Sequence, residues 1–182
     1  MKLFLKTILS FSFIFFVFFI KGQNIEPQPG DNLLNAELNK YVGTWKWESN
    51  GTSLTIVFKK VNAKVPVTMN LYADILFGYH QYKVNNTIVE DSLPFINATF
   101  NQKKYTIITF GTQPNLPPNR ISVGFNHPSK NKSVQGEFEY IDANHIKIVS
   151  LKNYQGIKVN LPGQPPYDNT ITLPQNIILT KQ

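Results

Sequence analysis

Hydrophobic and polar side chains alternate along most of the chain from residue 43 onward. In the clearest run, residues 134–140, the even positions are Val, Gly, Phe and Tyr, and the odd positions are Gln or Glu. A period of two puts successive side chains on opposite faces of a strand, whereas a helix would spread them around its axis. The sequence therefore predicts antiparallel strands with one buried face.

Turn signals separate these alternating runs at short intervals. Asn50–Gly51 and residues 142–144 (Asp-Ala-Asn) each join two runs, and both predict tight hairpins. This spacing gives about eight to ten strands. We predict an all-β fold, namely a single antiparallel β-barrel or barrel-like sandwich in one domain.

One short helix is expected before the first strand. Residues 33–41 place three leucines and Tyr41 near helical spacing, just ahead of the first alternating run. No other segment after the first 22 residues has a convincing helical pattern.

The alternation changes phase in the middle of one run. From Met69 to Tyr79 the apolar positions are odd, but the apolar residues Tyr82 and Val84 are even. One inserted residue moves every later side chain to the other face of a strand. We therefore predict a bulge or sharp bend near Gly78.

The first 22 residues have the three parts of an export signal. Lys2 and Lys6 precede an apolar stretch, residues 7–20, and Gly22 is a small residue at a suitable cleavage point. The apolar stretch is shorter than the roughly 20 residues that span a bilayer, which argues against a permanent anchor. We expect a bacterial protein that is secreted or periplasmic, with no stable membrane span in the mature chain.

This assignment divides the chain into three parts: a signal peptide at 1–22, a flexible polar leader at 23–32 and a barrel domain at 33–182. Because the chain contains no Cys, an exported domain of this kind has no disulfides and depends on its packed core. Loss of the signal peptide removes three lysines and lowers the formal net charge from +7 to +4. Arg120 is the only arginine, and adjacent lysines are not interleaved with aromatic residues, so we expect no nucleic-acid partner.

Both tryptophans of the chain lie on one face of the first predicted strand. Trp45 and Trp47 share this face with Gly43. A short helix that runs into residues 40–48, KYVGTWKWE, resembles the entry to the lipocalin-like (calycin) β-barrels. In that family a Gly-x-Trp on the first strand closes one end of the barrel, and Gly43 and Trp45 match this motif.

Other parts of the chain bear on this resemblance. The segment GTWK is also similar to the start of fatty-acid-binding proteins, but there the first strand leads into a helical lid, whereas here residues 50–52 return directly into a second strand. Lipocalins place a basic residue late in the chain across the Trp; Arg120 lies too early for this role, and Lys181 matches it only loosely. The whole chain is similar to an uncharacterised family of small exported bacterial proteins, which implies no activity.

The resemblance implies a barrel that can hold a small apolar molecule. In one interpretation, Trp45 and Trp47 are simply core side chains that fill the tapering end of the barrel. In the other, Trp47 lines a cavity for an apolar or aromatic ligand, with Leu54, Ile56 and Phe58 as the adjoining wall. The sequence leaves both open.

The alternative function is an extracellular interaction module with a side-chain-filled barrel. It would bind a surface protein or glycan through two proline-rich loops, residues 113–119 and 161–169. Tyr154 and Tyr167, near the second loop, are the candidate contacts, since exposed aromatic rings stack on sugars and anchor interfaces. A filled interior favours this module, and an open cavity favours a carrier.

No pattern in the sequence indicates catalysis, a cofactor or a metal. His80, His127 and His145 lack the spacing of metal ligands, and we place His127 and His145 on the surface, beside a proline and a turn. Glu90 and Asp91 point to opposite sides of a strand, which does not suit a catalytic carboxylate pair. We expect a non-enzymatic protein without cofactor, catalytic residues or metal ligands.

Overall fold

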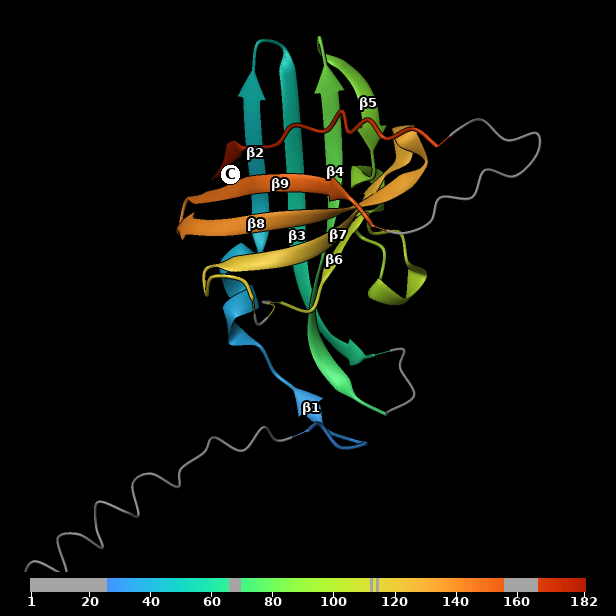
Figure 1. Cartoon of the computed structure of the whole chain (residues 1–182), viewed down its shortest axis with the longest axis vertical. Coiled ribbons are helices and arrows are strands. Elements are labelled where there is room, and N and C mark those ends of the chain that lie inside the picture. The colour runs from blue at the N-terminus through green and yellow to red at the C-terminus, as the bar shows by residue number, and fades with distance from the viewer. Residues whose placement is uncertain (1–25, 66–69, 112, 114, 156–166) are drawn as a thin grey trace, which may run out of the picture.

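The computed structural model describes residues 26–65, 70–111, 113, 115–155 and 167–182 (Figure 1). The described part contains ten strands and four short 3-10 helices. In chain order these are β1 (Asn32–Leu33), η1 (Ala36–Tyr41), β2 (Gly43–Ser49), β3 (Thr52–Lys64), β4 (Tyr72–Val84), β5 (Thr87–Asp91), η2 (Leu93–Phe95), η3 (Phe100–Gln102), β6 (Ile107–Thr109), β7 (Arg120–His127), η4 (Pro128–Lys130), β8 (Lys132–Asp142), β9 (His145–Asn153) and β10 (Ile177–Lys181).

Eight of these strands close into an antiparallel barrel. Neighbours follow the order β4, β3, β2, β10, β9, β8, β7 and β6, and β6 pairs back with β4. Two extra strands lie on β4 outside this circuit: β1 pairs with it in parallel and β5 antiparallel. In Figure 1, β7, β8 and β9 cross in front of β2, β3 and β4. The predicted all-β barrel is therefore confirmed.

The predicted hairpins form where the turn residues require them. Asn50 and Gly51 join β2 to β3 with φ values of 49° and 74°, the left-handed pair that a tight hairpin needs. Residues 143–144 join β8 to β9. Both turns connect strands that pair with each other, so the local signal and the barrel agree.

A single hydrophobic core fills the barrel. The inward faces of the strands contribute one contiguous cluster of buried side chains. Its largest fully buried members are Trp45, Phe58, Phe125, Phe138, Leu38, Leu54, Ile56, Leu76, Ile107 and Ile121. Phe58 and Phe138 meet edge to face across the interior, with ring centroids 5.8 Å apart.

One end of the barrel is closed around Trp45. Its indole Nε1 donates a hydrogen bond of 2.7 Å to the carbonyl of Tyr41, at the end of η1. The Lys181 ammonium, at the end of β10, lies 5.1 Å from the centroid of the Trp45 ring. Gly43 has a φ of 133°, a conformation that favours glycine, and the position of a Cβ there would be 2.9 Å from Lys181 Cε.

The N-terminal helix is shorter than predicted. Only Ala36–Tyr41 is helical, as a 3-10 helix whose Asn35 side chain accepts a hydrogen bond from the Glu37 N–H. Leu33 belongs to β1 and is 43% exposed, and Leu34 is 74% exposed. The spacing of the leucines was therefore misleading, because two of them do not face the core.

The bulge predicted near Gly78 is absent from the pairing of β4 with β3, and the register of β4 shifts instead between Tyr82 and Lys83, where it pairs with β5. β4 pairs with β3 without interruption from Tyr72 to Lys83. The phase change has another cause, because both faces of β4 are buried from Ala73 to His80. Even positions face the barrel interior. Odd positions are covered on the outside by the segment between β4 and β6, where Phe77 packs against Phe100 and other rings. Met69, at the start of the predicted run, lies outside the described residues.

Candidate functional site

The five interior positions proposed for a ligand all lie in or against the barrel core. Trp45, Leu54 and Ile56 are fully buried and Phe58 is 1% exposed, all within the contiguous core cluster. Trp47 is partly buried and packs against that cluster. These side chains are in contact with one another or with other core residues, and this arrangement favours the interpretation of the tryptophans as packing residues.

The two candidate loop tyrosines have different surroundings. Tyr154 follows the end of β9 and is 43% exposed. Tyr167 is partly buried: its hydroxyl donates to Asn153 Oδ1 at 3.3 Å, and the Lys132 ammonium lies 5.4 Å from its ring centroid. Tyr154 is therefore the more available of the two. Residues 161–166 of the second proline-rich loop lie outside the described residues, as do residue 112, which precedes the first loop, and residue 114 within it.

Tyr154 lies at a cleft on the outer surface of the barrel. This cleft, of about 380 Å³, runs over β6 and β7. A smaller one of about 90 Å³ adjoins it over β8 and β9. The two share Gln113, Ser122 and Gln135, so we treat them as one feature, the outer cleft. Both parts lie outside the closed sheet rather than in its interior.

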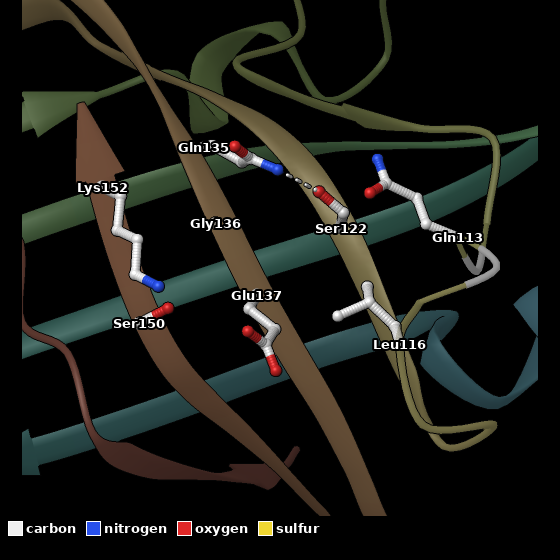
Figure 2. A pocket seen from close by; sticks show the side chains of 8 residues that line it. All are labelled: Gln113, Leu116, Ser122, Gln135, Gly136, Glu137, Ser150 and Lys152. Atoms are coloured by element: carbon white, nitrogen blue, oxygen red, sulfur yellow. Dashed lines mark hydrogen bonds between the residues drawn. The ribbon is translucent and has the colours of Figure 1, made fainter. Parts of the chain in front are cut away.

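The floor of the outer cleft is made of small and polar side chains in register. Gly124 on β7 lies opposite Ile108 on β6 and Gln135 on β8. The Gln135 carboxamide donates a hydrogen bond of 3.1 Å to the Ser122 hydroxyl (Figure 2). A Cβ at residue 124 would lie 3.2 Å from the Tyr154 hydroxyl, so the glycine lets the tyrosine lie close over the sheet.

Two walls border this floor. Figure 2 shows Gln113 and Leu116 on the loop side and Ser150 and Lys152 on the β9 side. Phe110 adds a ring that is 52% exposed. The cleft therefore combines exposed aromatic rings with carboxamides and hydroxyls, which both donate and accept hydrogen bonds.

The charges at the smaller end of the cleft are nearly balanced. Glu137 accepts a hydrogen bond of 2.6 Å from Arg120, whose guanidinium also binds Glu139. Lys152 has no carboxylate within 4 Å among the residues that the structure describes. No strong field of one sign therefore selects a highly charged ligand.

A second, unexpected polar feature is buried at the other end of the barrel from Trp45. The Glu90 carboxylate on β5 lies between two histidines, His80 of β4 and His127 of β7, and all three side chains are fully buried. His80 Nε2 is 2.7 Å from Glu90 Oε2, and His127 Nδ1 is hydrogen-bonded to Oε1. Ser129 adds two donors to Oε1, its backbone N–H at 3.0 Å and its hydroxyl.

These hydrogen bonds decide the charge of Glu90. Burial opposes ionisation of its carboxyl group, but the hydrogen bonds from His127, His80 and Ser129 outweigh that effect. The pKa of Glu90 is therefore held well below its usual value, and the group is an anion at neutral pH. In the described part of the chain, no group of three or more His, Cys, Asp or Glu side chains is arranged to hold a metal ion.

His127 also contacts the chain on its other side. Its Nε2 accepts hydrogen bonds from the Thr172 backbone N–H at 3.2 Å and from the Thr172 hydroxyl at 3.1 Å. Hydroxyl, imidazole and carboxylate follow one another here as they do in hydrolase triads. The backbone N–H shares the same ring nitrogen, however, so the contact holds the Thr172 segment in place.

The assignment of His127 to the surface was wrong, since the residue is fully buried. The sequence did carry evidence for burial. His127 continues the series of odd-numbered residues on β7, Ile121, Val123 and Phe125, whose side chains face the core. The following proline made it look like a loop residue. Glu90 carried no such signal, because its partner His127 is 37 residues away in the sequence. His145 lies at the start of β9, partly buried and hydrogen-bonded to Asp142.

The chain belongs to a family of unknown function (DUF6705), whose model matches residues 1–182. No curated protein matches the chain, and no solved structure does. Among the described residues, no helix has the length and apolar character that crossing a bilayer requires.

Proposed function

We propose that this protein is an exported, non-enzymatic β-barrel of lipocalin-like type that binds a glycan in its outer cleft. The observation that carries this proposal is the position of Tyr154, an exposed aromatic side chain that lines the cleft with its hydroxyl against Gly124, next to the Gln135–Ser122 pair. An aromatic face beside carboxamides and hydroxyls matches a sugar, which presents C–H faces and hydroxyl edges.

The size of the cleft supports a glycan over a folded protein partner. A volume of about 380 Å³ lies in the range of small-molecule sites. Stable protein–protein interfaces instead bury about 800 Å² on each partner over a broader surface. The balanced charge of the lining supports a ligand that is neutral or weakly charged.

The filled interior supports an outer site over an inner one. The side chains proposed as cavity walls, Leu54, Ile56 and Phe58, are at most 1% exposed and pack in the core cluster. An apolar ligand would have to displace them. The interior carrier is therefore the weaker of the two hypotheses.

The lipocalin-like type is supported by the closed end of the barrel. Gly43, Trp45 and Lys181 combine the motif and the basic residue that this resemblance implies. Export rests on residues 1–22, which lie outside the described residues. N-terminal sequencing of the protein recovered from the periplasm or medium tests it, and a full-length product retained in the cytoplasm would contradict it.

Glycan binding is tested on an array of surface polysaccharides, followed by calorimetric titration of the best ligand. Replacing Tyr154 by Ala should weaken binding about tenfold, the loss of about 1.4 kcal/mol typical of an aromatic contact at a binding site. Tyr72→Ala is the matched control, because Tyr72 is also 43% exposed but lies on the β3–β4 hairpin, away from the cleft. An array without any bound glycan, or equal losses in both variants, would reject the proposal.

A further inference from the structure

The geometry points to an acid-sensitive latch, in which protonation of His127 loosens residues 167–173 at the Thr172 backbone N–H, at the end of the barrel. This latch segment crosses the barrel end between β5 and the β7–β8 turn. It does not form part of the outer cleft, so the inference is independent of the proposed function.

The latch segment is attached at several points. The Thr172 carbonyl accepts a hydrogen bond of 2.9 Å from the Tyr82 hydroxyl, and its N–H donates to His127. Leu173 follows and is 2% exposed within the core cluster. Lys132 donates to the carbonyls of Asp168 and Thr170 at 2.8 and 2.7 Å. The segment therefore places one core side chain and closes this end of the interior.

The hydrogen bonds of His127 fix its tautomer. A backbone N–H can only donate, so the Nε2 atom that faces Thr172 N must be the unprotonated acceptor. The ring proton is then on Nδ1, where it points at Glu90. His127 joins Glu90 to the Thr172 backbone N–H only in this neutral form.

A proton on Nε2 would break this connection. Two N–H groups, one from the ring and one from Thr172, would then face each other at 3.2 Å. The Thr172 hydroxyl can rotate to accept, but its backbone N–H cannot. Thr172 is exposed, so a small outward movement gives that N–H a water partner.

His80 does not have the same restriction. Its Nε2 also faces Glu90, but its Nδ1 lies 2.7 Å from the Thr106 hydroxyl, which donates or accepts as required. A change of charge on His80 leaves its partners satisfied. Only His127 converts protonation into a lost hydrogen bond.

Glu90 supports the charged form of the ring. Because its pKa is held well below the usual value, it remains an anion while histidine side chains gain their second proton. Among the described residues, the other ionisable groups near His127 and the latch segment are His80 and Tyr82 on β4, Lys130 on η4, Lys132 on β8, and Tyr167 and Asp168 in the segment itself. Asp168 is paired with Lys130 at 2.7 Å, and this bond lowers its pKa, so it too keeps its charge under mild acid.

Amide hydrogen exchange tests the latch in the full-length mature protein. Between pH 7.5 and 5.5, the protection factor of the Thr172 amide should fall about tenfold, the factor for loss of one hydrogen bond worth about 1.4 kcal/mol. The Phe138 amide in β8 should keep its protection. His127→Gln, which retains an acceptor but does not titrate, should abolish the change, and His145→Gln should preserve it.

A second measurement does not depend on any variant. A ¹H–¹⁵N correlation spectrum of the wild-type imidazoles at pH 7.5 should show His127 protonated at Nδ1 and not at Nε2. An Nε2–H tautomer, protection factors independent of pH, or a pH response that persists in His127→Gln would each overturn the latch.

Discussion

The replacement Glu90→Gln should destabilise the protein strongly although it preserves the shape of the side chain. Glu90 receives four hydrogen bonds, from His80, His127 and two groups of Ser129. Each bond to a charged acceptor contributes about 1 kcal/mol more than the bond to a neutral one. The amino group of the carboxamide takes the place of Oε2 and faces His80, whose Nε2 can accept from it, so the three bonds that converge on Oε1 carry the loss. For these three bonds together we expect a loss of about 3 kcal/mol.

Urea unfolding at pH 7, followed by the fluorescence of Trp45 and Trp47, measures this loss. The midpoint should fall while the slope stays constant, because the surface exposed on unfolding does not change. In a thermal melt the same loss corresponds to a decrease of about 10 °C in Tm for a domain of this size.

The matched control is Glu48→Gln. Glu48 also pairs with a cation, Lys46, but both side chains are largely exposed, so the variant should unfold at the wild-type midpoint. If Glu90→Gln cost less than about 1 kcal/mol, the reasoning would fail, because the carboxylate would then contribute no more than a surface charge.

Three further outcomes follow from the same structure. The folded-state pKa of Glu90 lies below its unfolded value, so its contribution to stability is present above about pH 4.3 and declines as the pH falls further. The urea midpoint of the wild type should therefore drop more steeply in acid than that of Glu90→Gln. Gly136→Val should lower the free energy of unfolding in urea by about 1–3 kcal/mol, since a Cβ at that position would already lie 2.9 Å from Val123 Cγ2. An unchanged midpoint would mean that the core repacks around the larger side chain. A fatty acid or aromatic probe titrated at neutral pH should leave the fluorescence of Trp45 and Trp47 unchanged. A saturable change would instead support the hypothesis that the barrel interior binds an apolar ligand.

The candidate site was only partly predictable from the sequence. Tyr154 was identified because it lies near a proline-rich loop, and exposed aromatic rings stack on sugars and anchor interfaces. The cleft beneath it was not, because it needs Gly124, Gln135 and Gln113 to come together from two strands and a loop. The sequence shows each of these only as an ordinary strand or loop residue.

The linear pattern by itself determined that the chain forms antiparallel strands. The period of two and the left-handed turn residues act within a few positions of each other, so local geometry is enough. The same pattern placed Trp45, Leu54, Ile56 and Phe58 on inward faces, and the structure confirms that placement.

Only the tertiary structure decided how the sheet closes and which polar groups it encloses. The outer face of β4 is buried because a segment after β5 folds back over it. No pattern within the β4 sequence itself predicts this contact. Likewise, Glu90 becomes a stable buried anion only when β4 and β7 bring two histidines to it. A charge is tolerated in a core when distant strands supply its partners, and such long-range contacts are absent from any short stretch of sequence.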